Sequence, residues 1–354
     1  MLDFPWLKRK QPALAGVYLS HSAVALAAVC RPTGVDGSGA AEAFRCMASP
    51  IQGGGEISAS LQTQKATLGL EKTDCTLVLA PDFYTLSLIE RPSVAEQELK
   101  DAVRWKIQEY LEFPAEEAVV DVFPLPQAAS RGHSSMIFVV AVQKSKLKTL
   151  VHAVSSTGLH PTAIDIAELS LRTLAESLFP EADSAVGLLR ITANNGVINI
   201  SRGDELFLSR RITGVPSDFD EVSWNTFKDM MLLQVQRSID YYESALSQGA
   251  AQVLLVAATH EWQSRIVEYL AEMLPLGVRD LPEYLCDQFD LELFNPEPRA
   301  LRSSSLSSED KQALAAAIPA LGGALRSAQS ALPRVTAPIG EAGVQPSELR
   351  GVSG

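Results

Sequence analysis

The sequence predicts an α/β protein built from two related halves, because one pattern of two strands joined by a polar turn occurs twice. The first copy covers residues 15–29 and the second covers residues 187–200. Each copy leads to a third apolar segment, at 43–47 and 206–208 respectively. Short apolar runs bounded by polar turn residues are typical of strands, so each half is predicted to open with the same three-stranded unit.

A duplicated hairpin of this kind is the first element of each half in the actin and sugar-kinase type of fold, in which the two turns bind ATP. Such turns need acidic residues to hold the hydrated Mg²⁺ and glycines that let backbone amides approach the phosphates. This chain has mostly polar, non-acidic residues in both turns. The sequence therefore predicts the fold together with a degenerate nucleotide site.

Composition and charge restrict the class of protein further. At 354 residues the chain is long for one core, so two or more domains are expected. Its hydrophobic fraction of 46% is that of an ordinary globular protein. The net charge of -12 argues against a protein that binds the nucleic-acid backbone, and we expect no nucleic-acid partner. An acidic surface instead favours basic partners, including the Lys- and Arg-rich cytoplasmic flanks of membrane proteins.

No catalytic or metal site is predicted. The cysteines lack the paired spacing of a disulfide framework or a zinc site, so free thiols are expected at Cys30, Cys46, Cys75 and Cys286. The chain has no nucleophile-elbow serine, no Walker lysine and no zincin helix. We therefore expect the protein not to be an enzyme.

The first twelve residues are predicted to form a flexible arm, in which bulky apolar residues lie beside Lys8, Arg9 and Lys10. Two interpretations remain open: residues 1–10 touch an anionic lipid surface, or the arm docks on its own domain. The uncharged stretch at 13–30 resembles a signal peptide, but the polar residues of the first turn interrupt it.

The middle of the first half changes pattern, which predicts an inserted subdomain. Residues 83–158 alternate as strand, helix, strand, strand and helix. The helix predicted at 94–111 has Leu99, Val103 and Ile107 at the three-to-four spacing of a buried face.

The second half is predicted to contain a long helix at 224–246, a strand at 253–257 and a helix at 262–274. Ser307 with Asp310 three residues later is expected to cap a last short helix, which closes near residue 326.

Three segments resemble the PilM family of type IV pilus assembly proteins beyond the class of fold. The segment at 235–244 is similar to the family's long-helix signature, and 103–114, continuing to 119–121, is similar to the motif of its inserted subdomain. The segment Leu321-Gly322-Gly323-Ala324-Leu325-Arg326 resembles its closing helix. The degenerate turns are most similar to the MshI branch, which serves mannose-sensitive haemagglutinin (MSHA) pili.

The resemblance implies an actin-like, ribonuclease H-like duplicated ATPase fold with a 1C-type insertion. Its expected parts are a flexible arm (1–12), subdomain 1A (13–82, 159–184 and 307–326), the 1C-type insertion (83–158), a second half with 2A and a reduced 2B (185–296), and a disordered tail (327–354).

The resemblance also implies a cytoplasmic protein, peripheral to the inner membrane through its partners. Family members bind the cytoplasmic N-terminal tail of a bitopic PilN-like subunit in a groove that involves the inserted subdomain. The pilus assembly ATPase and the platform proteins are further expected partners.

Aligning the family's first nucleotide turn, Gly-Ile-Asp-Ile-Gly-Ser, places Tyr18 at the acid and Ser20 at the glycine, with Ser22 following. The Gly-Gly turn that contacts adenosine in the family falls at Ala257 and Ala258, which lack both glycines. The first and third signatures are therefore both degenerate.

The second nucleotide turn, Asp-Ile-Gly-x-Gly in the family, falls on Arg190, Thr192 and Asn194. At about 5 Å, Arg190 would repel Mg²⁺ by several kcal/mol. Asn195 and Gly196 are alternatively a two-residue hairpin turn that needs no ligand. No cofactor is expected, although Arg190 is able to attract a nucleotide phosphate without metal, so ATP binding stays open.

A candidate partner surface lies on the helix predicted at 94–111. Trp105 is about 200° around the helix from its buried stripe, on the side of Glu98, Asp101 and Glu109. An aromatic side chain among acids suits a basic, partly apolar peptide. The alternative is that Trp105 packs against the first domain.

These observations predict that the protein is a non-catalytic scaffold of the inner-membrane pilus platform. It is expected to be a pseudo-ATPase that binds a PilN-like tail. The alternative is an actin-like switch that binds or hydrolyses ATP in pilus or type II secretion assembly.

Overall fold

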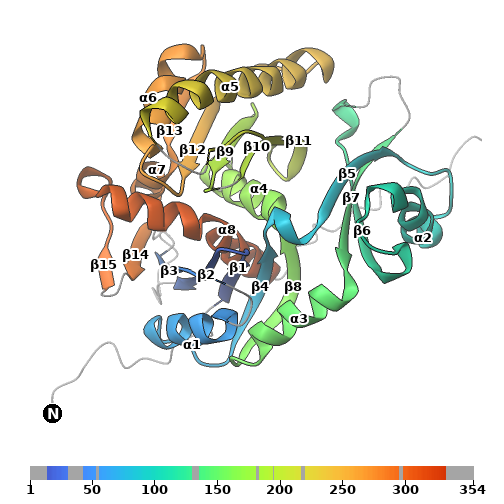
Figure 1. Ribbon diagram of the computed structural model, residues 1–354, viewed down its shortest axis with the longest axis horizontal. Helices are drawn as coiled ribbons and strands as arrows, with labels where there is room; N and C mark the ends of the chain where they lie inside the picture. The colour runs from blue at the N-terminus through green and yellow to red at the C-terminus, as the bar shows by residue number, and fades with distance from the viewer. Residues whose placement is uncertain are drawn as a thin grey trace, which may run out of the picture.

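Two mixed β-sheets with the same internal strand order form the two lobes of the molecule (Figure 1). The computed structural model describes residues 14–30, 43–52, 56–129, 135–180, 183–193, 195–216, 220–294 and 298–331.

The first sheet has seven strands in the order β15-β14-β3-β2-β1-β4-β8. β1, β2 and β3 are antiparallel neighbours, whereas β4 and β8 follow β1 in parallel. The strands are β1 (Leu14–Leu19), β2 (Ala23–Cys30), β3 (Ala43–Pro50), β4 (Thr73–Leu79), β8 (Leu159–Ile166), β14 (Asp290–Phe294) and β15 (Pro298–Ala300). The crossover from β3 to β4 uses helix α1 (Ile57–Thr67), as a connection between parallel strands requires.

The second sheet has five strands in the order β11-β10-β9-β12-β13. Here too three antiparallel strands are followed by two parallel ones. The strands are β9 (Val186–Ile191), β10 (Gly196–Arg202), β11 (Glu205–Ile212), β12 (Val253–Ala258) and β13 (Gly277–Asp280), and helices α5 (Glu221–Asp240) and α6 (Gln263–Met273) belong to the same lobe. Order and direction repeat those of β3-β2-β1-β4-β8, which confirms the duplication that the sequence predicts.

A third, antiparallel sheet forms the inserted subdomain in the order β5-β7-β6. Its elements are β5 (Thr85–Glu90), α2 (Glu96–Lys106), β6 (Ala118–Pro124) and β7 (Met136–Gln143). The expected end of the insertion at residue 158 is wrong, because α3 (Lys144–Ser155) packs in the first lobe, where Leu150 and Val154 are part of the core. Leu99, Val103 and Ile107 are buried in one cluster with Ile137 and Val139 of β7, as their helical spacing predicts. The helix is shorter than expected, because α2 ends at Lys106 and a 3-10 turn follows.

Helices α4 (Ala167–Leu178), α7 (Leu281–Gln288) and α8 (Ser308–Ala331) lie between the two large sheets (Figure 1). Gly16 allows the closest contact, because a Cβ there would lie 2.0 Å from the carbonyl oxygen of Ala320. Gly322 has the same role beside α4, where a Cβ would lie 2.2 Å from the carbonyl oxygen of Ser170. Both glycines therefore let α8 lie directly on its neighbours.

The predicted cap of the last helix is confirmed. The backbone N–H of Asp310 donates to Ser307 Oγ at 3.1 Å, and the N–H of Ser307 donates to Asp310 Oδ2 at 3.2 Å. This reciprocal pair satisfies two backbone donors at the start of α8.

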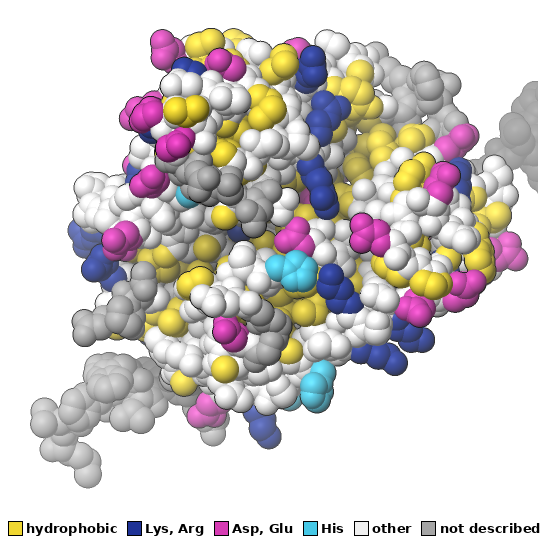
Figure 2. Space-filling view, in the orientation of Figure 1, with side chains coloured by type: hydrophobic (Ala, Val, Ile, Leu, Met, Phe, Trp, Pro, Cys, Tyr) yellow, Lys and Arg dark blue, Asp and Glu magenta, His cyan; other side chains and the backbone are white. Residues whose placement is uncertain are grey.

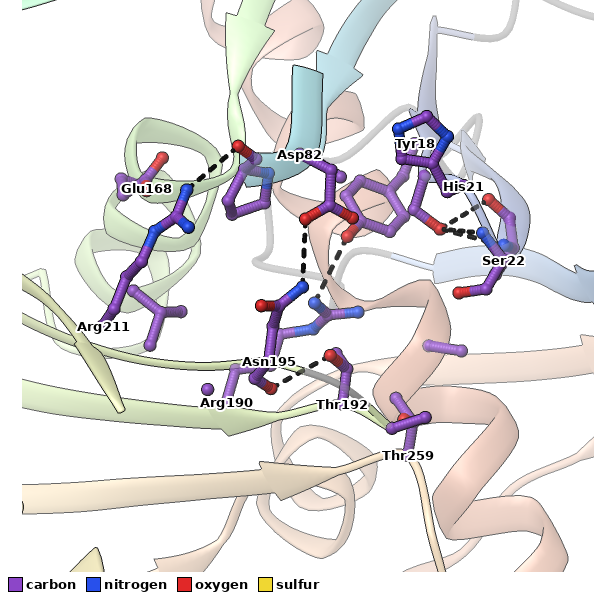
Figure 3. A pocket seen from close by; sticks show the side chains of 18 residues that line it. Tyr18, His21, Ser22, Asp82, Glu168, Arg190, Thr192, Asn195, Arg211 and Thr259 are labelled. Atoms are coloured by element: carbon purple, nitrogen blue, oxygen red, sulfur yellow. Dashed lines mark hydrogen bonds between the residues drawn. The ribbon is translucent and has the colours of Figure 1, made fainter. Parts of the chain in front are cut away.

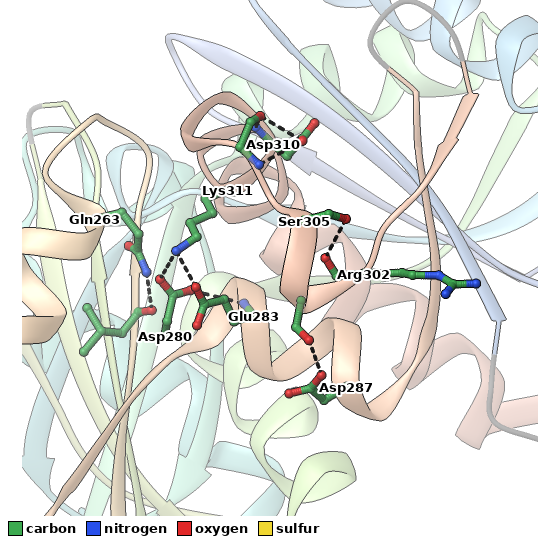
Figure 4. A network of polar contacts seen from close by, with 11 residues as sticks. Gln263, Asp280, Glu283, Asp287, Arg302, Ser305, Asp310 and Lys311 are labelled. Carbon is green, nitrogen blue, oxygen red and sulfur yellow. Dashed lines mark hydrogen bonds and ion pairs between the residues drawn. The ribbon is translucent and has the colours of Figure 1, made fainter.

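Lys311, in the first turn of α8, joins the two lobes (Figure 4). Its Nζ lies 3.1 Å from Asp280 Oδ2 and 2.6 Å from Glu283 Oε1, at the end of β13 and the start of α7. The Lys311 and Asp280 side chains are only 11% and 6% exposed. The ion pair is therefore largely shielded from solvent.

Two expectations about the C-terminal part are wrong. Residues 185–296 do not all belong to the second half, since β14 pairs in parallel with β3 of the first sheet. The segment at 327–331 is the end of α8 rather than part of a disordered tail, because Ser327 is buried and bonded to Thr76. The expected arm at 1–12 and the rest of the expected tail lie outside the described residues.

Candidate functional site

A cleft of about 150 Å³ between the two lobes contains most of the residues that the sequence places at the degenerate nucleotide site (Figure 3). Those that line it are Tyr18, Ser20, Ser22, Arg190, Thr192, Asn195 and Gly196. Ala257 and Ala258 do not line it, because they are fully buried at the end of β12. Asn194 lies outside the described residues.

In the turn between β1 and β2, backbone amides are hydrogen-bonded to a side chain of the same turn. Ser20 Oγ accepts hydrogen bonds from the backbone N–H groups of Ala23 at 2.9 Å and Ser22 at 3.3 Å. Ser20 Oγ in turn donates to the carbonyl oxygen of Ala23 at 3.0 Å. Amides that would bind a phosphate in a glycine-rich turn are therefore already occupied by a side chain.

The turn between β9 and β10 is a four-residue loop, so the expected two-residue turn at Asn195 and Gly196 is wrong. Gly196 is the first residue of β10 and pairs with Ile191. The backbone N–H of Thr192 donates to the carbonyl oxygen of Asn195 at 2.7 Å and closes the loop. Gly196 is required by space, because a Cβ there would lie 2.7 Å from Cβ of Ile212.

Arg190 and Tyr18 point toward one another across the cleft (Figure 3). Arg190 Nη1 donates to the hydroxyl of Tyr18 at 3.3 Å, and its guanidinium carbon lies 5.1 Å from the ring centre. Both side chains are buried, at 5% and 3% exposure. A cation over an aromatic face is stabilised by the ring's quadrupole. Two residues that stand at the positions of the family's acids thus contact each other across the cleft.

Further hydrogen bonds hold the lobes together around this pair. Asn195 Nδ2 donates to Asp82 Oδ1 at 3.0 Å, and Arg211 Nη2 donates to the carbonyl oxygen of Pro81 at 3.2 Å. No sequence pattern marks Asp82 and Arg211 as cleft residues. Only the fold brings them to the two turns.

Glu168, the second residue of α4, is a buried carboxylate of the cleft that the sequence analysis also missed. It accepts a short hydrogen bond from the hydroxyl of Tyr84. Burial raises the pKa of Glu168, and the Tyr84 hydroxyl partly offsets that effect. Burial, with Glu168 beside it, raises the pKa of Tyr84 well above its usual value. The available signal was an acid in the first turn of a helix that follows a strand.

The third nucleotide signature is replaced by a glutamine. The Gln263 side chain accepts from the backbone N–H of Ala258 and donates to the carbonyl oxygen of Val256 at 3.0 Å. Buried at 2% exposure, it fixes the end of β12.

The residues of the cleft do not fit a magnesium nucleotide. Pockets for such ligands usually enclose roughly 300–1,000 Å³, whereas this cleft has about 150 Å³. Its turn amides are bonded to Ser20, and the buried cation Arg190 lies where Mg²⁺ would need a carboxylate. Within the described ranges, no cluster of three or more His, Cys, Asp or Glu side chains could hold a metal ion.

The cysteines predicted to be free are free where the structure describes them. Cys46, Cys75 and Cys286 form no disulfide. Burial raises the pKa of the Cys46 thiol to about 12, which disfavours the thiolate form.

The candidate partner surface around Trp105 is open to solvent. Trp105 is 53% exposed, which rules out the alternative that it packs against the first domain. Glu98, Asp101 and Glu109 are exposed on the same subdomain, and Asp101 pairs with Arg104 at 2.7 Å. The aromatic and acidic character expected of this face is therefore present.

A concave surface beside α3 was not predicted. A pocket of about 310 Å³ lies between α3 and the rest of the first lobe, and Ile51, Ile57 and Leu150 line it. Lys146 stands at its edge, with Nζ 4.8 Å from the ring centre of Phe83. The pocket therefore offers apolar contacts beside one cation.

None of the helices in the described part of the chain combines the length and apolarity that crossing a bilayer requires.

Comparison with known proteins gives a family match for part of the chain. Residues 84–214 match the family model described as type IV pilus assembly protein PilM. This segment contains the inserted subdomain, α4 and the hairpins of the second lobe.

Solved structures resemble the chain over most of its length. A chain of the PilM-PilN type IV pilus biogenesis complex is 19% identical, with a TM-score of 0.63, covering 90% of this chain and 99% of that one. The cytoplasmic domain of EpsL, an inner-membrane component of the Vibrio cholerae type II secretion system, is 12% identical, with a TM-score of 0.42 and coverage of 86% and 94%. A Bacteroides thetaiotaomicron protein with an actin-like ATPase fold is 11% identical, with a TM-score of 0.46 and coverage of 89% and 98%. The chain has the actin-like fold.

Proposed function

We propose that this chain is a PilM-like scaffold of a type IV pilus, which binds the cytoplasmic N-terminal tail of a PilN-like membrane subunit. The observation that carries the proposal is the PilM family match over residues 84–214, the part that includes the inserted subdomain. The likeness of the whole fold to a chain of the PilM-PilN complex supports it. The protein would then lie in the cytoplasm, against the inner membrane.

We further propose that the chain neither hydrolyses nor requires ATP. The support is the cleft, in which Ser20 occupies the turn amides and Arg190 stacks on Tyr18. The degenerate turns also support assignment to the MshI branch and an MSHA-type pilus. In this role the closed cleft keeps the lobes in one arrangement, so the partner surfaces are presented without a nucleotide.

Two surfaces are candidates for the tail, one beside α3 on the first lobe and one on α2 of the inserted subdomain. The pocket beside α3 is favoured because apolar concave sites bury more of a bound peptide than flat ones do. The Trp105 face suits the basic residues of such a tail, since Glu98 and Glu109 are exposed there.

A binding measurement with two variants separates these surfaces. The probe is the synthetic N-terminal tail of the PilN-like subunit encoded with this protein, titrated by fluorescence anisotropy. Thr149 lines the pocket and is exposed, so Thr149→Trp fills the pocket without disturbing the core. We expect Thr149→Trp to weaken binding by at least about tenfold, and the conservative Thr149→Ser to change it little.

Trp105→Ala is measured in the same assay. Loss of affinity in Trp105→Ala alone would move the tail site to the α2 face. No detectable binding of the tail to the wild-type protein would contradict the proposed function.

A further inference from the structure

A second groove lies between the free edges of two sheets. β11 is the terminal strand of the five-stranded sheet, and β5 is the terminal strand of the inserted subdomain. The two strands face each other between the second lobe and the inserted subdomain (Figure 1). The groove between them, here called the edge groove, has a volume of about 250 Å³ and shares no lining residue with the cleft.

The edge groove has an apolar floor and exposed apolar walls. Phe207 of β11 and Phe138 of β7 form part of the floor and are buried, at 1% and 4% exposure. Leu88 of β5 and Tyr241 after α5 form the walls and are 41% and 37% exposed. Figure 2 shows hydrophobic side chains lining the recess between the upper lobe and the inserted subdomain. An exposed apolar recess of this kind marks an interaction site more often than a plain surface.

The two strands that border the groove, β5 and β11, also have backbone groups without a partner strand. In the part of the chain that the structure describes, β5 pairs only with β7, and β11 pairs only with β10. Their outer edges therefore present N–H and C=O groups that an extended chain is able to pair with. Neither strand contains a proline, which would protect such an edge.

The positive charge beside the edge groove indicates which kind of partner segment would bind there. The guanidinium carbon of Arg210 lies 5.3 Å from the ring centre of Tyr241, and its Nη1 donates to the carbonyl oxygen of Arg237 at 3.5 Å. Among the described residues, Arg210 has no carboxylate within 4.0 Å. A row of Lys and Arg side chains borders the recess in Figure 2. In a chain with a net charge of -12, this local excess of cations favours carboxylates of a partner.

We propose that the edge groove binds an extended segment of a partner protein in which apolar residues alternate with Asp or Glu. The segment adds a strand along β11 or β5, places its apolar side chains on Phe207 and Phe138, and directs a carboxylate to Arg210. This partner differs in charge from a basic membrane tail. The proposal does not depend on the function proposed above.

The test uses the full chain and labelled eight-residue peptides, the length of β11. One set alternates Asp or Glu with Val, Ile or Leu, and a matched set has Lys in place of the acids. We expect the acidic set to bind by fluorescence anisotropy and Arg210→Glu to weaken that binding at least about tenfold. Arg302→Glu makes the same charge change at an exposed arginine that does not line the groove, and we expect less than about a twofold effect.

Amide hydrogen exchange separates strand addition from simple charge attraction. Bound peptide should slow exchange at the outer amides of β5 or β11 and leave β13, the other edge of the second sheet, unchanged. No acidic peptide binding below about 1 mM would overturn the proposal. Equal binding of the Lys set, an equal loss in Arg302→Glu, or no added protection on either strand would also overturn it.

Two further measurements distinguish two other occupants of the edge groove. If Arg210→Glu dissolves a dimer seen by sedimentation, the occupant is a second copy of this chain. If removal of residues 332–354 strengthens peptide binding about tenfold, the occupant is the chain's own C-terminal segment. Either result would overturn the assignment to a partner protein.

Discussion

The interlobe cleft and the edge groove both lie where two parts of the molecule meet, and each contains an arginine stacked on a tyrosine, yet they differ in burial and in backbone pairing. In the cleft, Arg190 is buried and stacked on Tyr18. In the edge groove, Arg210 is only half-buried beside Tyr241, and the outer edges of β5 and β11 pair with no strand that the structure describes.

This difference indicates which of the two sites can bind a ligand without breaking hydrogen bonds that the protein already makes. A ligand that enters the cleft must displace hydrogen bonds that the protein already makes, such as the one from Asn195 to Asp82. A peptide that enters the edge groove adds backbone hydrogen bonds along strand edges that have no partner strand among the described residues. We therefore expect changes in the joint between the lobes to alter stability, and changes in the groove to alter binding.

Removing the ion pair that joins the lobes should give the largest effect. Lys311→Met leaves the buried Asp280 without its cation (Figure 4). We expect the free energy of unfolding to fall by about 3 kcal/mol, measured by urea denaturation. Arg210→Met, at the edge groove, should change it by less than about 0.5 kcal/mol. Equal effects of the two variants would remove the distinction between a closed joint and an open groove.

The buried carboxylate of the cleft should produce a pH-dependent effect of intermediate size. Burial raises the pKa of Glu168 in the folded protein above its unfolded value. The stability that this group contributes is fully present below its ordinary pKa of 4.5 and is lost as the pH rises through the folded pKa. Glu168→Gln does not titrate, so its melting temperature relative to wild type should rise as the pH increases above 4.5.

The matched control for this prediction is Glu98→Gln, which makes the same change on the exposed face of α2. A difference between Glu168→Gln and wild type that is constant with pH would show that Glu168 does not carry the effect.

Magnesium ATP should have the smallest effect. With the turn amides bonded to Ser20, we expect about 5 mM Mg·ATP to raise the melting temperature by less than about 1 °C. ATP without metal is the matched condition, tested on wild type and Arg190→Ala. A rise of several degrees with Mg·ATP, or hydrolysis by pure protein that Arg190→Ala abolishes, would restore the alternative of an ATP-dependent switch.

Local patterns were enough to predict the repeated unit of the fold. The strands around 15–29 and 187–200 are apolar runs with polar turns, and their pairing in both sheets follows from short connections. The stripe Leu99, Val103 and Ile107 predicted which face of α2 is buried. Ser307 and Asp310 predicted the start of the last helix.

Features that depend on distant segments could not be predicted. β14 joins the first sheet through a partner about 250 residues earlier, and its short sequence has no pattern that names that partner. The cleft residues Asp82 and Arg211 are separated by a large part of the chain and meet only in the folded state. The edge groove likewise exists only because two sheets lie beside each other.

The contact between Ser327 and the first strand has a consequence for how the molecule is made. Ser327 Oγ donates to the carbonyl oxygen of Ala15 at 3.1 Å, across 312 positions of sequence. After β1 has left the ribosome, nearly the whole chain must still be synthesised before α8 is available to cover β1. The lobe that is translated first is therefore completed last, and during synthesis its exposed apolar strands need protection, for which chaperones are the general cellular means.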